Sequence, residues 1–292
     1  MLNRPSRTAE HVALFRALES VRSGPQLFVD PYAEAFLPAR YRAIIHVSRL
    51  PAIGPVVTRS VEWYIDRRWS AGPRASAVVR TKLIDDLVAA TVAAGAQQVL
   101  LLGAGYDSRA LRLPELADLP VYEVDHPATQ AAKRRALPTT SANLHFVPVD
   151  LEVEDLGEAL RRGGMRRDRA TVVVWEGVTN YLTAPAVDTT MRCLATELPA
   201  GSRIIFTYVD RAAMDDNSRF AGYERWHASV RGVGEGWTFG FHPAELPNYL
   251  AERRMRLIED VSARDVAERY LTPLHRHEPA PEFYRIAATQ VL

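Results

Sequence analysis

Short apolar runs alternate with longer helical patterns over the second half of the chain. The runs predict buried strands at residues 99–102, 121–124, 144–149, 171–174 and 203–209. Helical periodicity fills the gaps at 127–137, 156–162 and 183–198. Repeated strand–helix units of this length imply right-handed crossovers and a parallel sheet with helices on both faces. A sixth strand at 255–261 and an antiparallel last strand at 283–292 bring the expected number to seven.

The first 95 residues contain helical patterns and no strand. Apolar positions recur at helical spacing through 6–19, 41–50, 58–69 and 75–93, and Asp30-Pro31 begins another helix. We therefore expect an N-terminal helical lid at 1–95 and a core domain at 96–292. Residues 211–240 interrupt the alternation with a polar, glycine- and aromatic-rich stretch, expected to be a loop insert that completes the lid.

Composition narrows the possible partners and the compartment. The chain has 292 residues and a formal net charge of +1, so charge gives no case for a nucleic-acid or membrane partner. Its single cysteine, Cys193, cannot form an internal disulfide, and the first ten residues are polar. We expect a cytoplasmic protein, monomeric or homodimeric, with no metal.

A glycine-rich turn follows the first expected strand. Gly103, Ala104 and Gly105 come directly after residues 98–102, and glycine permits a tight turn with close backbone approach to a ligand. Ser108 stands where a dinucleotide-binding pattern has its third glycine, which weakens a nicotinamide interpretation. The turn alone is a weak signal, equally compatible with an ordinary strand end.

Three acidic residues end the neighbouring strands. Asp125 lies 20 residues after Gly105 and is expected to accept from a ribose diol, the alternative being a helix N-cap. Asp150 and Leu151 are expected at an adenine ring, although Asp150 also suits a loop cap. Glu176 suits an ammonium group or a buried ion pair.

One arginine before the core completes this set. Arg80 is the candidate to bind a ligand carboxylate in a bidentate manner, the alternative being an exposed helix face. Adenine, a diol, a carboxylate and a cationic amine occur together in S-adenosylmethionine. The sequence therefore predicts that cofactor above the strand ends.

Several motifs in the same order resemble the leucine carboxyl methyltransferase-like group of class I S-adenosylmethionine-dependent methyltransferases. They lie at residues 8–9, 16–17, 30–33, 79–86, 102–109, 122–127, 149–151 and 175–182. The resemblance implies a seven-stranded, mostly parallel Rossmann-like methyltransferase sheet. It also implies cofactor contacts from Arg80, the 103–105 turn, Asp125, Asp150, Leu151, Glu176 and Gly177.

The resemblance also implies that Tyr181 lies near the transferred methyl group. Trp226 of the insert is a further candidate for the acceptor site, as are Tyr64, Arg67 and Arg68, which share a helix face. The alternative for these last three is aromatic packing with exposed arginines. Residues 40–69 depart from the family's usual pattern.

The acceptor is expected to be a carboxylate, or a phenolic hydroxyl, of a small natural product such as a polyketide. A carboxylate is ionised at neutral pH and needs no general base, so we assign no catalytic residue. His227 and His242 border the insert and are the possible bases for a hydroxyl acceptor. Two alternatives are a protein C-terminal carboxyl methyltransferase and a nucleotide-fold protein that transfers no methyl group.

Overall fold

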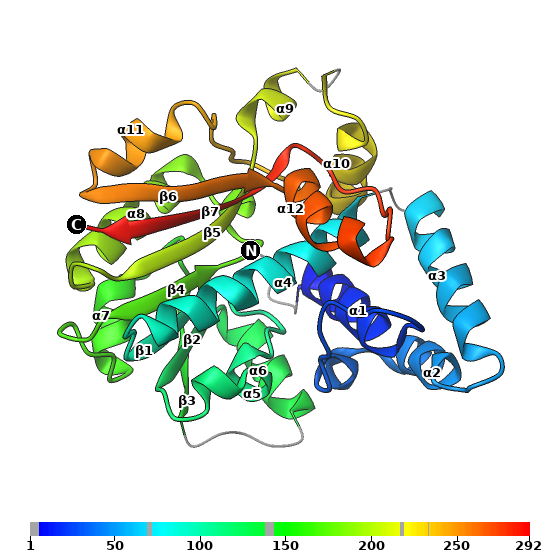
Figure 1. Ribbon diagram of the computed structural model, residues 1–292. Helices are drawn as coiled ribbons and strands as arrows, with labels where there is room; N and C mark the ends of the chain where they lie inside the picture. The colour runs from blue at the N-terminus through cyan, green and yellow to red at the C-terminus, as the bar shows by residue number, and fades with distance from the viewer. Residues whose placement is uncertain (1–5, 69–71, 138–142, 217–218, 233) are drawn as a thin grey trace.

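The computed structural model describes residues 6–68, 72–137, 143–216, 219–232 and 234–292, and its centre is one seven-stranded sheet (Figure 1). The strand order is β3-β2-β1-β4-β5-β7-β6, with β7 antiparallel to both of its neighbours and the other pairs parallel. The strands are β1 (Gln98–Leu102), β2 (Val121–Asp125), β3 (Leu144–Pro148), β4 (Thr171–Trp175), β5 (Arg203–Val209), β6 (Met255–Ser262) and β7 (Tyr284–Val291). Each lies within one residue of its predicted limits, so the expected sheet is confirmed.

Helices cover both faces of the sheet, which explains the uninterrupted apolar runs. Val99 and Leu101 of β1 pack on one side, and Leu100 and Leu102 on the other. The first side is covered by α4 (Pro73–Ala93) and α12 (Ala263–Tyr270). The second is covered by α7 (Leu156–Arg162), α8 (Ala184–Glu197) and α11 (Leu246–Ala251). Alternate residues of a central strand are therefore buried in opposite directions.

The connections from β1 to β2 and from β2 to β3 are shorter than those from β3 to β4 and from β4 to β5. They contain α5 (Arg109–Arg112), η2 (Pro114–Leu116) and α6 (Pro127–Ala136). Lys133 of α6 lies 2.6 Å from the buried Glu123 carboxylate on β2. Burial raises the pKa of Glu123 to about 7, against the opposing effect of Lys133. Glu123 is therefore part of a buried structural ion pair.

The N-terminal helices form a separate cap with its own apolar core. They are α1 (Arg7–Val21), η1 (Ala33–Phe36), α2 (Ala39–Ser48) and α3 (Gly54–Arg68), packed through residues such as Leu14, Leu18 and Ile45. Helix α4 packs on both units: Val79 and Ile84 lie in the sheet core, and Ala77 lies in the core of the cap. It therefore links the cap to the sheet.

Two predicted helices in the cap differ from the structure. The helix expected after Asp30-Pro31 is only the short turn η1, because Leu37 before Pro38 is extended and ends it. The helix predicted at 58–69 begins earlier, at Gly54, and Trp69 lies outside the described residues.

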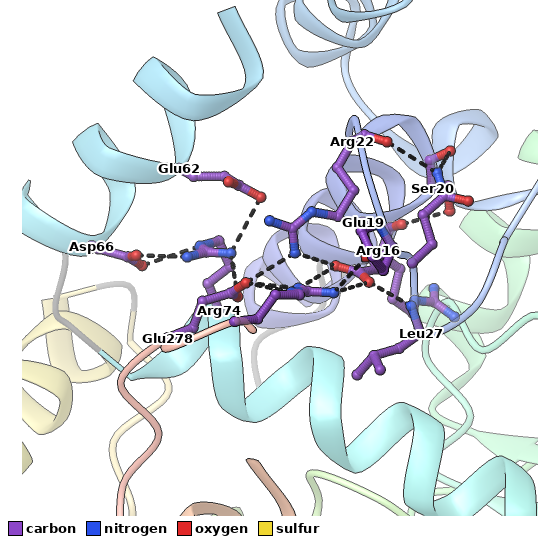
Figure 2. Close-up of polar contacts among 12 residues, drawn as sticks. Arg16, Glu19, Ser20, Arg22, Leu27, Glu62, Asp66, Arg74 and Glu278 are labelled. Carbon is purple, nitrogen blue, oxygen red and sulfur yellow. Dashed lines mark hydrogen bonds and ion pairs between the residues drawn. The ribbon is translucent and has the colours of Figure 1, made fainter. Parts of the chain in front are cut away.

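A buried charge cluster joins the cap to the end of the chain (Figure 2). Glu278, between α12 and β7, contacts Arg22 of α1 at 2.9 Å, Arg74 of α4 at 2.8 Å and Arg276 at 2.7 Å. Arg276 also reaches Glu19 of α1 at 2.7 Å. Burial raises the pKa of Glu278, but these arginines outweigh burial and lower the pKa to about 2.

The insert at 211–240 is more ordered than predicted. It contains α9 (Arg211–Asp215) and α10 (Tyr223–Gly232), which replace the expected loop. Trp226 stacks on Tyr284 at 5.3 Å between ring centroids, so the insert packs onto the last strand. Helix α11 follows the insert and begins at Leu246. Among the described residues no helix is long and apolar enough to cross a bilayer, and no group of three or more metal-ligating side chains occurs.

Candidate functional site

The glycine turn after β1 has the backbone geometry that the sequence predicts. Gly103 and Gly105 have φ values of +62° and +49°, in the left-handed region. A Cβ atom on Gly103 would lie 2.3 Å from Cγ2 of Val178, so no other residue fits without displacing the chain. Ser108 is buried and donates to the Asp30 carboxylate at 2.6 Å, which ties the turn to the cap.

A cavity of about 340 Å³ opens above this turn, at the carboxyl ends of the parallel strands. Its volume lies within the range of small-ligand sites. The nine predicted cofactor residues all line it: Arg80, Gly103, Ala104, Gly105, Asp125, Asp150, Leu151, Glu176 and Gly177. Parallel topology brings these residues together because the strand ends share one edge of the sheet.

Asp125 is held rigidly at the end of β2. Its carboxylate accepts from the N–H of Gly105 and, at 2.6 Å, from the N–H of His126. Burial raises its pKa, while the two backbone hydrogen bonds act in the opposite direction. The N-cap of α6 is His126, whose side chain accepts from the N–H of Ala128. Asp125 is therefore not the helix N-cap that the sequence allowed as an alternative.

Asp150 both caps a loop and lines the cavity. One carboxylate oxygen accepts from the N–H of Glu152 at 3.0 Å, which stabilises the turn after β3. Asp150 and the partly buried Leu151 also line the cavity, on the side of Asp125. The loop cap and the cavity wall are therefore compatible.

Glu176 lies between two buried arginines. Arg80 donates to one carboxylate oxygen at 2.7 Å and Arg109 to the other at 2.8 Å. Burial raises the pKa of Glu176, but Arg109 and Arg80 outweigh burial and the pKa is lowered. Arg80 is only 5% exposed and lies over the Tyr284 ring at 5.1 Å, so it is not an exposed helix face. The buried ion pair that the sequence allowed for Glu176 is therefore formed, and it is part of the cavity wall.

Nothing in the sequence indicated a role for Arg109, although this residue lies in the motif at 102–109. Arg109 also contacts the Asp107 carboxylate and, at 2.7 Å, Asp85 of α4. Asp107 has its pKa lowered to about 2, because Arg109 and other cations outweigh burial. Arg109 thus joins the glycine turn, α4 and Glu176 in one network.

The part of the cavity wall next to Arg80 is aromatic, and we call it the aromatic end. Tyr181 and Trp226, both predicted at the acceptor, line it together with Tyr284. Burial raises the pKa of Tyr181 to about 12, while contacts with Trp237 and Thr8 partly offset the effect. The Tyr181 hydroxyl is therefore protonated at neutral pH and can donate a hydrogen bond.

Helix α1 and the insert roof this aromatic end. Glu235 accepts from the N–H groups of Arg7 at 3.0 Å and Thr8 at 3.2 Å, and from the Ser6 hydroxyl at 3.3 Å. Negative charge at a helix N-terminus is stabilising, so Glu235 fastens the insert to α1. Sequence reasoning missed this contact, which joins positions more than 220 residues apart.

The other acceptor candidates lie elsewhere. Tyr64 and Arg68 of α3 border a shallow outer groove with Arg225, Ala228 and Ser229, and only Ser229 of these also lines the main cavity. Arg67 lies over the exposed Trp63 ring at 5.5 Å. The structure therefore does not bring Tyr64, Arg67 and Arg68 to the cavity.

The possible bases are also placed differently. His227 stacks on Trp237 at 5.6 Å and His242 lies 3.7 Å from Asp215, and neither lines the cavity. His11 of α1, which sequence reasoning overlooked, does line it. Burial, followed by Arg7, lowers the pKa of His11, so the imidazole is neutral at pH 7.

A doubly wound sheet, a glycine turn after its first strand and acids at the next strand ends define a nucleotide-binding protein of the class I methyltransferase type. The chain belongs to the leucine carboxyl methyltransferase family, whose sequence profile matches residues 9–195. This confirms the resemblance seen in the motifs.

Individual relatives agree with this assignment. FRAAL3718 of Frankia alni is 36% identical over 241 residues, which cover 80% of each chain. A protein of Mycobacteroides abscessus is 30% identical over 300 residues, covering 89% of this chain and 92% of its own. Both are named as S-adenosyl-L-methionine-dependent methyltransferases. A structure named as a methyltransferase from Thermobifida fusca aligns over 99% of this chain and 96% of its own chain, with a TM-score of 0.56 and 17% identity. This similarity supports the fold. The protein is therefore an S-adenosyl-L-methionine-dependent methyltransferase, and its predicted cofactor is confirmed.

Proposed function

We propose that the protein is an O-methyltransferase that methylates a carboxylate, or a phenolic hydroxyl, of a small natural product such as a polyketide. The supporting observation is the roof over the cavity, where Glu235 joins the insert to the N-terminus of α1. A roofed cavity suits a small acceptor better than a folded protein's C-terminus, which would need an open groove.

The cavity wall fits the cofactor. Asp125, positioned by two backbone N–H groups, accepts from the ribose hydroxyls. Asp150 accepts from the adenine amine and Leu151 covers the ring. Arg80 binds the carboxylate of the cofactor through guanidinium nitrogens other than the Nε atom that holds Glu176. Glu176 orients Arg80 for this contact.

The protein's contribution to the reaction is orientation. When bound, the cofactor supplies an electrophilic methyl group on a sulfonium, with a neutral thioether as leaving group. The aromatic end, formed by Tyr181, Trp226 and Tyr284, excludes water and holds the acceptor oxygen in line. Such alignment can supply about 7–11 kcal/mol of the barrier. Tyr181, protonated because its pKa is about 12, donates to the acceptor's second oxygen.

A separate observation, the position of His11, supports a phenolic acceptor. Its hydroxyl needs a base, and His11 offers a neutral imidazole in the cavity wall. His11→Gln would then lower kcat for a phenol by about 10²–10⁴-fold while leaving a carboxylate acceptor unaffected. In the wild type, the phenol reaction would decline only below the lowered pKa of His11, because the imidazole must be unprotonated.

The test is to identify the bond that is made. The purified protein is supplied with cofactor carrying an isotopically labelled methyl group and with three acceptor sets: polyketide-type aromatic acids, the matching phenols, and peptides with free C-termini. Label in a product that releases methanol in mild alkali identifies an ester, whereas alkali-stable label identifies an ether. Transfer to small acids or phenols supports the proposal. Labelling of the peptides alone, or only of nitrogen or carbon acceptors in a wider panel, would contradict it.

A further inference from the structure

The cap exposes an unusual concentration of apolar side chains. Ten large hydrophobic residues are exposed among those the structure describes, and six of them fall within residues 47–64. These six are Val47, Leu50, Ile53, Val56, Trp63 and Tyr64, with exposures from 37% to 63%. They lie on α2, on α3 and in the turn between them, which together form the helical hairpin of residues 39–68 at the outer edge of the molecule (right in Figure 1). A clustered apolar patch indicates a binding surface more often than scattered residues do.

The tip of this hairpin is apolar as well. Leu50, Pro51, Ala52 and Ile53 are consecutive, and all four are exposed. Turns are normally polar, and an exposed run of four apolar residues is unfavourable unless it serves a function. The Gly54 N–H donates to the Leu50 carbonyl at 2.8 Å, and proline has no N–H to satisfy. Much of the tip's backbone therefore needs no water partner.

The hairpin is also strongly basic. It contains six exposed arginines, at positions 40, 42, 49, 59, 67 and 68, of which Arg49 is paired with Glu34 of η1. Its two acids face inward: Glu62 is buried against Arg74, and Asp66 pairs with Arg74 at 2.7 Å. The net charge of +1 for the whole chain conceals this local excess.

This combination discriminates between possible occupants. A second copy docked about a two-fold axis would place arginines against arginines, which is repulsive. An anionic bilayer satisfies both features, because apolar residues enter the boundary between headgroups and acyl chains while arginines meet lipid phosphates. Trp63 and Tyr64 are the residue types that favour this boundary. The outward position of the tip also suits penetration into a soft surface.

We propose that the α2–α3 hairpin docks the protein onto an anionic membrane surface, with residues 50–53 inserted and the arginines at the headgroups. This docking is independent of which acceptor is methylated. It also gives the exposed side chains of α3, absent from the cavity wall, a role of their own.

Vesicle flotation with the full chain tests the proposal. Vesicles of phosphatidylcholine alone are compared with an equal mixture of phosphatidylcholine and phosphatidylglycerol, at low and high salt. The protein is expected to float with the mixture, to remain behind with phosphatidylcholine alone, and to bind less at high salt.

Two pairs of variants separate the apolar contribution to vesicle binding from the electrostatic one. Ile53→Glu should lower the partition coefficient at least tenfold, while Ile258→Glu, an exposed apolar residue on β6, should leave it unchanged. Arg59→Gln should lower it about fivefold, while Arg162→Gln on α7 should not. Circular dichroism checks that all four variants fold, and their exposed positions make this the expected result.

Three results would overturn the proposal. The first is absence of binding to the mixed vesicles. The second is equal binding by Ile53→Glu and Ile258→Glu. The third is a concentration-dependent dimer, seen by analytical ultracentrifugation, that Ile53→Glu dissociates while vesicle binding is absent, since a second copy would then cover the face.

Discussion

Replacement of Asp125 by alanine tests how the cofactor is held. The carboxylate is fixed by the N–H groups of Gly105 and His126 before any ligand binds. In the proposed site, its remaining lone pairs accept from the ribose hydroxyls. We expect Asp125→Ala to weaken binding of S-adenosyl-L-methionine because a charged acceptor is lost from the cavity wall.

The size of the effect follows from hydrogen-bond energies. A hydrogen bond to a charged group contributes about 1.5–3 kcal/mol, which corresponds to about 10- to 150-fold in Kd. Two hydroxyls do not double this figure, since they share one carboxylate that is already hydrogen-bonded. The variant also leaves two backbone N–H groups without their acceptor, which costs about 1–3 kcal/mol of folding stability.

Isothermal titration calorimetry gives Kd, and thermal unfolding of the free protein gives the stability cost separately. Asp118→Ala is the matched control, because Asp118 is an exposed aspartate shortly before β2 and outside the cavity wall. Affinity of a folded Asp125→Ala protein within twofold of wild type would refute the assignment of the ribose to Asp125.

Three further predictions concern the turn, the charge cluster and the roof. Gly103→Ala should destabilise the protein by about 2–4 kcal/mol and impair cofactor binding, because the methyl group would meet Val178 at 2.3 Å; unfolding and calorimetry measure both. Glu278→Gln should cost roughly 3 kcal/mol at pH 7, since its pKa is about 2 when folded and 4.5 when unfolded. That stability is complete above pH 4.5 and lost as the pH falls towards 2, so urea unfolding of wild type and variant should converge in acid. Glu235→Ala should raise the acceptor KM about fivefold by loosening α1, with cofactor Kd unchanged; steady-state kinetics measures both.

Matched variants control each of these. Gly164→Ala has a positive φ of +86° but no atom within 4 Å of the new Cβ, so it should cost less than Gly103→Ala. Glu282→Gln and Glu245→Ala replace exposed glutamates close in sequence to Glu278 and Glu235 and should be nearly silent. Equal effects within any pair, or a Glu278→Gln deficit that persists at pH 2, would contradict the corresponding argument.

The sheet and the cavity wall at its strand ends were accessible from sequence for one physical reason. Central parallel strands are buried on both faces, so they give apolar runs whose ends are easy to place. Their parallel topology then brings Asp125, Asp150 and Glu176 to one edge without further information. The network around Arg109 was not accessible, because a charged residue near a turn gives no sign of its partners on α4.

The cap shows where periodicity misleads. Thr58, Glu62 and Ile65 form the buried side of α3, although two of them are polar, because Glu62 pairs with Arg74. Helical spacing correctly groups Tyr64 with the arginines but does not say which side faces the cavity. The insert was predicted as a loop because its stabilising partners, such as Tyr284, lie at the end of the chain.

The most direct test of the account is a crystal structure with S-adenosyl-L-homocysteine. The account predicts the ribose at Asp125, the adenine between Asp150 and Leu151, and the amino-acid carboxylate at Arg80. Ligand density away from these side chains, or an adenosine group placed at Tyr181 and Trp226, would contradict it.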